Sequence, residues 1–227
     1  MSARAEPTSF LYPFIESEER DSAGLLAALA SSAEAKIDES RALRAASLAR
    51  CADALAHAGA AMATRFRRGG RLFAFGNGGS ATDAEGSAHL FRHPPSGSAL
   101  PALSLVDDRA VLTALANDVG YELVFSRQII AHAQPGDIAV GFSTSGDSAN
   151  MLRAFEEAAR RGLLTIGLCG YERAAMARSD AVQHCLVVPS ESVHRIQEAQ
   201  DALMLELWSI VQRHLHEGEE EEEREVT

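Results

Sequence analysis

The sequence of 227 residues is poor in cysteine and contains no long apolar run. Its three cysteines, Cys51, Cys169 and Cys185, form neither a C-x-x-C pair nor an even set, which argues against a disulfide scaffold and a structural zinc knuckle. No stretch approaches the roughly 20 apolar residues of a membrane span. The N-terminus also lacks a basic start followed by an apolar stretch. We therefore expect a cytoplasmic protein that neither enters a membrane nor is exported.

Lysine is scarcer still, because Lys36 is the only lysine among the 21 basic residues. It lies in an N-terminal helical stretch, which excludes a P-loop lysine and argues against Schiff-base catalysis. The arginine-rich segment 65–71 (RFRRGGR) lies at the end of a predicted helix, where cations are expected, and lacks interleaved aromatic residues. We expect no direct contact with nucleic acid.

The net charge of −11 is unevenly distributed along the chain. Residues 217–227 (EGEEEEEREVT) contain seven glutamates and one arginine, a net charge of −6, and the remainder carries −5. Such a run predicts a disordered, solvated tail. We divide the chain into an N-terminal arm (1–20), a single domain (21–216) and this acidic tail (217–227).

The domain has the sequence pattern of an α/β fold. Apolar residues at helical spacing predict two leading helices, at about 21–36 and 40–68. Short apolar runs then alternate with amphipathic stretches: strands are expected at 71–75, 102–106, 137–142, 163–169 and 181–188, and helices at about 80–92, 109–133 with a break near Gly120, 147–161, 172–178 and 193–216. This alternation predicts a doubly wound, five-stranded parallel sheet flanked by helices, with two N-terminal helices and a long C-terminal helix.

Two loops at the carboxyl ends of predicted strands have an unusual composition. Gly76-Asn77-Gly78-Gly79-Ser80 follows the strand RLFAF and precedes a helix. Glycines there permit positive φ and close approach of a ligand, and the helix N-terminus offers free amides to an anion. The segment also matches G-x-G-x-x-A, but no acidic residue follows at the dinucleotide-binding spacing. A tight strand-to-helix turn without a ligand is the alternative.

The second loop, Ser143-Thr144-Ser145-Gly146-Asp147-Ser148, follows the strand DIAVGF and also precedes a helix. Its four hydroxyls and the helix amides can surround an anion with neutral donors and without lysine. A serine-rich helix cap, with Asp147 or Ser148 satisfying the first turn, is the alternative. The two loops together favour a small molecule carrying a phosphate monoester.

Four motifs, GNGGS (76–80), AND (116–118), STSGDSAN (143–150) and RIQEAQ (195–200), together resemble the sugar isomerase (SIS) family. More narrowly they resemble its phosphoheptose isomerase branch, which includes the related initiator-associating protein of bacterial replication. The resemblance covers about 21–216. It implies a homotetramer with sites at subunit interfaces, and a phosphate held by Ser143, Thr144, Ser145 and Ser148. It also implies that the sugar faces Asn77, Gly78, Gly79, Ser80, Asn117, Asp118 and Gln197.

The zinc site of this branch is not retained. The branch places a histidine and, four residues later, a glutamate on the helix after GNGGS, and completes the site with the glutamine of RIQE and a histidine eight residues further on. The corresponding positions here are Gly86, Leu90 and Leu205, so that only Gln197 remains as a ligand. Zinc is therefore not expected at the family positions, and no other cofactor is implied.

A displaced site is an alternative to complete loss. Glu85 and His89 also stand at i, i+4, one residue before the lost pair, and His194 occupies a position where the family usually has aspartate. With Gln197, Asp201 or His93 they would supply the acid, the base or a metal site. Otherwise Glu85 and His89 are an exposed pair that stabilises the helix by a few tenths of a kcal/mol.

Two functions follow from the resemblance. The first is an aldose–ketose isomerase acting on sedoheptulose 7-phosphate or a similar sugar phosphate, with His89, Glu85 and His194 in shifted catalytic roles. The second is a non-catalytic, carbohydrate-derivative-binding protein that senses a phosphosugar or serves as a scaffold for a protein partner. The joint replacement by Gly86, Leu90 and Leu205 motivates the second.

Overall fold

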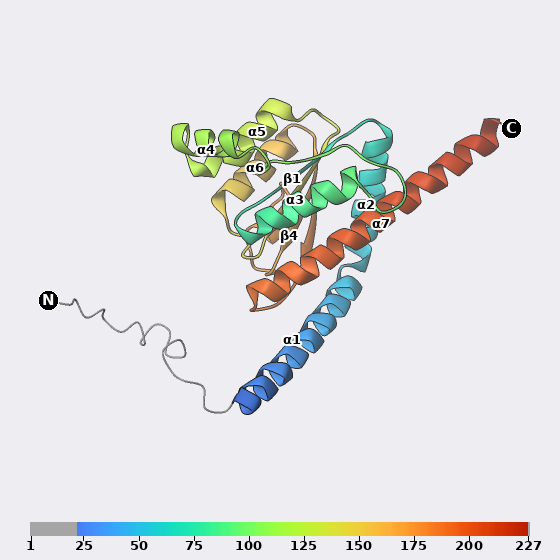
Figure 1. Cartoon of the computed structure of the whole chain (residues 1–227). Helices are drawn as coiled ribbons and strands as arrows, with labels where there is room; N and C mark the ends of the chain where they lie inside the picture. Colours follow the sequence, from blue (N-terminus) through green and yellow to red (C-terminus); the bar gives the residue numbers. More distant parts are fainter. Residues whose placement is uncertain (1–21, 227) are drawn as a thin grey trace. The chain divides into compact units, whose positions relative to one another are not determined.

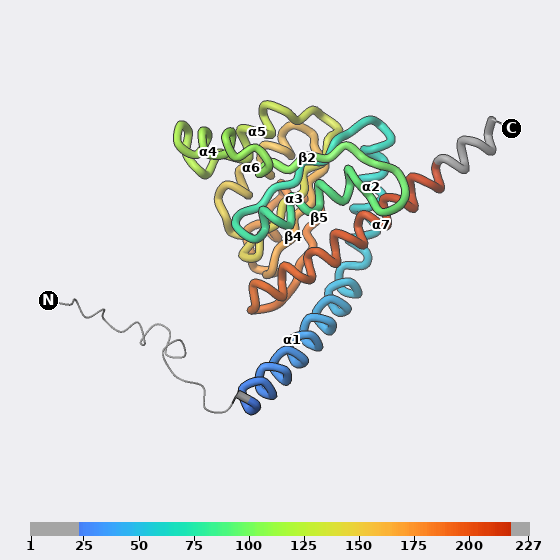
Figure 2. The backbone as a smooth tube through the Cα atoms, in the orientation of Figure 1, coloured from blue at the N-terminus to red at the C-terminus, as the bar shows by residue number. Residues whose placement is uncertain are grey.

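A computed structural model of the chain describes the backbone of residues 22–226 and the side chains of residues 23–218 (Figures 1 and 2). The predicted N-terminal arm lies outside these described residues. The chain divides into two compact units, Met1–Glu39 and Ser40–Thr227. In the first unit, every described side chain is exposed. Along the described residues, no helix combines the length and apolar character needed to cross a membrane.

The two leading helices are present, but their boundary differs from the prediction. Helix α1 spans Ser22–Arg50 and helix α2 spans Ala52–Arg67. The expected interruption at 37–39 does not occur, because this stretch contains no glycine or proline and its neighbours are strong helix formers. The break lies instead at Cys51, whose ψ of 6° departs from helical geometry.

The predicted five-stranded parallel sheet is confirmed. Its strands are β1 (Leu72–Gly76), β2 (Ala102–Ser104), β3 (Ile138–Ser143), β4 (Leu164–Cys169) and β5 (His184–Val187), in the order β2-β1-β3-β4-β5. All neighbouring strands are parallel. β2 and β3 lie on opposite sides of β1, so the sheet changes its winding direction between β1 and β3. In open parallel sheets, ligands bind at the carboxyl ends of the strands beside such a point.

Helices cover both faces of the sheet (Figure 1). α2, α3 (Gly79–Arg92) and α7 (Val193–Val226) pack on one apolar cluster, and α5 (Val124–His132) and α6 (Ala149–Arg160) pack on the other. On this second face the Phe75 ring lies 5.5 Å from that of Phe125 and 5.2 Å from that of Phe155, between ring centroids. The doubly wound arrangement is therefore observed.

Three further segments show where the predicted helices were right and wrong. The break near Gly120 is confirmed: α4 (Arg109–Asp118) ends before it, and a 3-10 turn (Tyr121–Leu123) leads into α5. The helix expected at 172–178 is reduced to a 3-10 turn, Met176–Arg178. α7 continues to Val226, where the sequence predicted a disordered tail from 217. Glutamate is a good helix former and the stretch contains no proline, which permits the continuation.

Candidate functional site

The first loop joins β1 to α3 at the point where the sheet changes direction. Gly78 has a φ of +58°, a conformation that L side chains rarely adopt. Gly76 is required for a different reason, since a Cβ there would lie 2.6 Å from the Ser80 carbonyl carbon. The loop is thus a sharp turn that brings the backbone amides of the α3 N-terminus to the carboxyl end of the sheet.

Gly79 lies directly against a side chain from α7. It is the first residue of α3, and a Cβ there would collide with the side-chain amide of Gln197, reaching 3.0 Å from Oε1 and lying still closer to Nε2. The absence of a side chain at Gly79 therefore lets Gln197 lie against the loop. The structure brings these two predicted site residues together although they are far apart in the sequence.

Asn77 connects the first loop to the second. Its Nδ2 donates to Asn150 Oδ1 and its Oδ1 accepts from Asn150 Nδ2, both at 2.8 Å. The Tyr121 hydroxyl donates to the same Oδ1 at 3.0 Å. Asn150 is buried in the first turn of α6. Asn150 and Tyr121 are not among the predicted site residues, although Asn150 closes the STSGDSAN motif and could have been found there.

The second loop leaves its hydroxyls close to the start of α6. Ser143 Oγ, at the end of β3, accepts a hydrogen bond from the Gly146 amide at 3.0 Å. Ser148 is the N-cap residue of α6, but its side chain makes no capping hydrogen bond. Asp147 does not cap α6 either, because its Oδ1 accepts from the Ala175 amide at 2.7 Å. The serine-rich cap offered as the alternative therefore does not explain this loop, whereas a cluster of hydroxyls at a helix N-terminus suits an anion.

The chain after β4 fixes the shape of the second loop. The Gly170 amide donates to the Thr144 carbonyl at 3.0 Å, and the Met176 amide donates to the Gly146 carbonyl at 2.9 Å. Gly146 itself has a φ of +70° and packs against Cys169. These contacts place the hydroxyls independently of any ligand.

Asn117 and Asp118 lie at the end of α4 and are both exposed. Asn117 Nδ2 donates to Asp118 Oδ1 at 2.8 Å. Among the described residues, no hydrogen bond joins either side chain to the two loops. Tyr121, a few residues further on, is the residue from this region that reaches Asn77.

Asp83 is a carboxylate that the sequence analysis missed. It lies on α3, and its Oδ2 accepts a hydrogen bond from Gln197 Nε2 at 3.1 Å. Burial raises the pKa of the Asp83 carboxyl to about 6; the Gln197 hydrogen bond acts in the opposite direction and the charge of Asp201 adds to the rise. Burial also raises the pKa of Asp201. Asp83 stands three residues before Gly86, on the same side of the helix, and this spacing is the signal that could have identified it.

The predicted catalytic residues lie elsewhere. At about 100° of rotation per residue, Glu85 lies about 200° and His89 about 240° around α3 from Asp83. The His89 ring instead lies beside that of His93, with 4.9 Å between the centroids. His194 is exposed in the first turn of α7. In the part of the chain that the structure describes, no hydrogen bond joins these three residues to the loops.

The residues at the family's zinc positions do not fit a zinc ion. Gly86 faces open space, Leu90 packs against the apolar core, and Leu205 is 52% exposed on α7. Over the described residues, no three or more His, Cys, Asp or Glu side chains gather as a metal site would require. Gln197, whose Nε2 donates to Asp83, is the one family ligand that remains. The three replaced positions therefore supply no ligand for a zinc ion of the family type.

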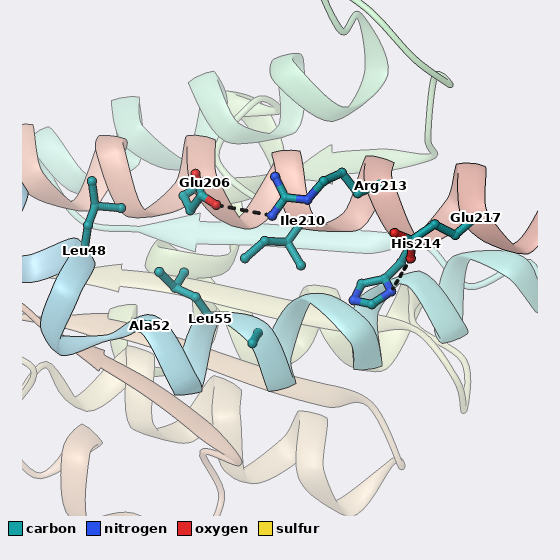
Figure 3. A pocket seen from close by; sticks show the side chains of 9 residues that line it. Leu48, Ala52, Leu55, Glu206, Ile210, Arg213, His214 and Glu217 are labelled. Atoms are coloured by element: carbon teal, nitrogen blue, oxygen red, sulfur yellow. Dashed lines mark hydrogen bonds and ion pairs between the residues drawn. The ribbon is translucent and has the colours of Figure 1, made fainter.

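A separate hollow of about 470 Å³ lies between the end of α1, α2 and α7 (Figure 3). Leu48, Leu55 and Ile210 supply its apolar part. Arg213 and Glu206 form an ion pair along its rim, as do His214 and Glu217 when the histidine is protonated. None of its lining residues belongs to the two loops. The hollow is therefore separate from the candidate site and lies among the helices α1, α2 and α7.

The chain is similar to known proteins in sequence and in structure. The family model described as SIS domain matches residues 37–170. A phosphoheptose isomerase of Roseiflexus sp. is 44% identical over 154 residues, covering 67% of this chain and 77% of the relative. One of Solidesulfovibrio magneticus is 38% identical over 188 residues, covering 80% and 89%. The structure of phosphoheptose isomerase from Neisseria gonorrhoeae matches with a TM-score of 0.74 and 32% identity, covering 81% of this chain and 98% of the other.

The two glycines of α3 allow a matched test of the Gln197 contact. Gly79→Ala should lower the free energy of unfolding by up to about 1 kcal/mol, because the new methyl group must displace the end of the flexible Gln197 side chain. Gly86→Ala meets no atom within 4 Å and should raise it by about 0.5–1 kcal/mol, since alanine is the better residue inside a helix. Urea unfolding measures both. Equal effects of the two substitutions would contradict the placement of Gln197.

Proposed function

The chain belongs to the SIS domain family, and we propose that it binds a sugar phosphate as a protein of the phosphoheptose isomerase type. One observation carries this proposal: the reciprocal hydrogen bonds between Asn77 and Asn150 hold two anion-binding loops together beside the point where the sheet changes direction. A ligand there would meet both loops at once. The relatives and the structural neighbour that carry the name phosphoheptose isomerase support the ligand class.

In the proposed complex, the phosphate lies in the second loop and the sugar lies toward the first. Ser143, Thr144, Ser145 and Ser148 would hold the phosphate through hydroxyls and the α6 amides, which requires no lysine. The sugar would face the first loop and the end of α4, where the residues concerned are Asn77, Gly78, Gly79, Ser80, Asn117, Asp118 and Gln197.

The first candidate reaction is aldose–ketose isomerisation of sedoheptulose 7-phosphate, by proton transfer next to the sugar carbonyl. Glu85, His89 and His194 are the proposed proton carriers for this reaction, and they would have to approach the sugar from outside the hydrogen-bonded network of the two loops. The second candidate is binding without turnover, by a phosphosugar sensor or scaffold in the cytoplasm that acts on a protein partner. The apolar character of Gly86, Leu90 and Leu205, which leaves no zinc ligand set, favours the second candidate.

A homotetramer is part of the proposal. The described residues of α1 up to Glu39 are all exposed, and they include Leu25, Leu26, Leu29 and Ile37. An isolated helix with exposed leucines gains little stability in water, so apolar contact with further copies of the chain would stabilise it. The apolar part of the hollow in Figure 3, lined by the end of α1 and by α2 and α7, is a second surface that further copies of the chain would cover.

The phosphate loop is tested by ligand-induced stabilisation. Sedoheptulose 7-phosphate should raise the Tm of the wild-type protein, since a ligand that binds only the folded state stabilises it. The double variant Ser143→Ala with Ser148→Ala should lose this increase. Ser96→Ala with Ser98→Ala, beyond the other end of α3, is the control and should retain it. A full increase in the loop variant would show that the phosphate binds elsewhere.

Turnover separates the two candidate functions. Purified protein is incubated with sedoheptulose 7-phosphate, with and without added zinc, and the aldose product is measured by NMR. We expect that zinc leaves the rate unchanged, because three of the four family positions offer no ligand atom. Stabilisation without product would support the sensor, and zinc-independent product would support an isomerase with displaced groups. A rate that depends on zinc would contradict the conclusion that the residues at the family's zinc positions do not fit a zinc ion.

Assembly is tested by the molar mass in solution. Size-exclusion chromatography with light scattering should give four chains for the wild-type protein. Leu26→Glu with Leu29→Glu should reduce the mass, because charges would replace the apolar side chains that we expect another copy to cover. Ser31→Glu, a charge on another side of the same helix, is the control. A monomeric wild-type protein would overturn this part of the proposal.

A further inference from the structure

Gln197 is the residue of α7 that reaches the first loop. Its amide group lies directly over Gly79, where a side chain on the glycine would displace it. It therefore stands at the N-terminus of α3, next to the backbone that a ligand between the two loops would approach. The neighbouring residues Ile196 and Ala199 are fully buried, which fixes the helix face on which Gln197 is presented.

Asp83 determines the orientation of the Gln197 side-chain amide. A carboxylate can only accept hydrogen bonds, so a hydrogen bond to Asp83 selects the amino group of Gln197. Nε2 is the atom that lies 3.1 Å from Asp83 Oδ2. None of the hydrogen bonds between described residues uses Oε1. The amide oxygen is thus left as an acceptor at the first loop.

We propose that Asp83 is a positioning residue, which holds the Gln197 amide so that Oε1 accepts a hydrogen bond from a hydroxyl group of the bound sugar. The inference rests on the proposed function and makes it more specific. The ligand is then a phosphorylated sugar or polyol whose hydroxyl donor reaches the first loop while its phosphate lies in the second. Inorganic phosphate has no sugar hydroxyl to offer and would use the second loop alone.

Asp201 serves as the comparison within the same cluster. It is one helical turn after Gln197 on α7, and its charge acts on Asp83. No hydrogen bond within the described part of the chain joins it to Gln197. A general effect of negative charge would therefore involve both aspartates, whereas the orientation of the amide depends on Asp83.

The experiment measures the Kd of sedoheptulose 7-phosphate and of inorganic phosphate by isothermal titration calorimetry. Asp83→Ala should weaken the sugar phosphate roughly tenfold, the scale of one hydrogen bond made to a buried partner, and leave inorganic phosphate unchanged. Asp201→Ala should change neither ligand by more than about twofold. An equal loss for both ligands would indicate general damage to the site and overturn the proposal.

A double-mutant cycle tests whether Asp83 acts through Gln197. Gln197→Ala alone should weaken the sugar phosphate as much as Asp83→Ala does, and adding Asp83→Ala to it should cause no further loss. Additive losses would show that Asp83 acts directly. If Asp83→Ala does not fold, Asp83→Asn replaces it: its side chain can donate as well as accept, so the amide can turn and affinity should fall by a smaller factor. Unchanged affinity in that variant would overturn the proposal.

The outcome also distinguishes this inference from the proposed function. If the wild-type protein binds neither sedoheptulose 7-phosphate nor phosphate, the proposed function fails. If it binds the sugar phosphate and the Asp83 variants bind it equally well, the proposed function stands and the role of Asp83 is wrong.

Discussion

The side-chain amides of Asn77 and Asn150 each donate to and accept from the other, and the placement of the candidate site depends on this pair. One amide follows β1 and the other begins α6, so the two bonds cross the gap between the loops that leave β1 and β3. The strands themselves are held in register by the sheet. The amide pair extends that order beyond the strand ends, where backbone pairing stops. A loop that is ordered in advance loses less conformational entropy when it binds a ligand.

The C-terminal helix provides the other side of the site. Its Gln197 lies against the first loop in the space left by Gly79, which has no side chain, and the amide donates a hydrogen bond to Asp83. The three residues come from two helices that pack on the same face of the sheet. The raised pKa of Asp83 reflects the burial of this contact. In the proposed site, neutral hydroxyls, backbone amides and one oriented side-chain amide would recognise a phosphorylated polyol.

Much of the fold could be predicted because its causes are local. Apolar runs that alternate with amphipathic stretches require parallel strands with helical crossovers, and all five strands and the break at Gly120 are observed. The errors arise where tertiary packing or helix propensity competes with a weak local signal. Helix α1 continues past 37–39 because nothing there stops it, residues 172–175 turn back to support the second loop, and α7 extends through the glutamates to Val226.

The sequence by itself determined the chemistry that the protein can use: two glycine- and serine-rich loops after strands, almost no lysine, and no histidine or glutamate at three positions of the family's zinc site. Residue types and their spacing carry this information, because strand ends of a parallel sheet meet at one edge. Only the tertiary structure decided which side chains meet. It joined Asn77 to Asn150, placed Gln197 over Gly79 and against Asp83, and left Glu85 and His89 on another side of α3. These pairings depend on the rotation and contact of whole helices, and no local pattern in the sequence specifies them.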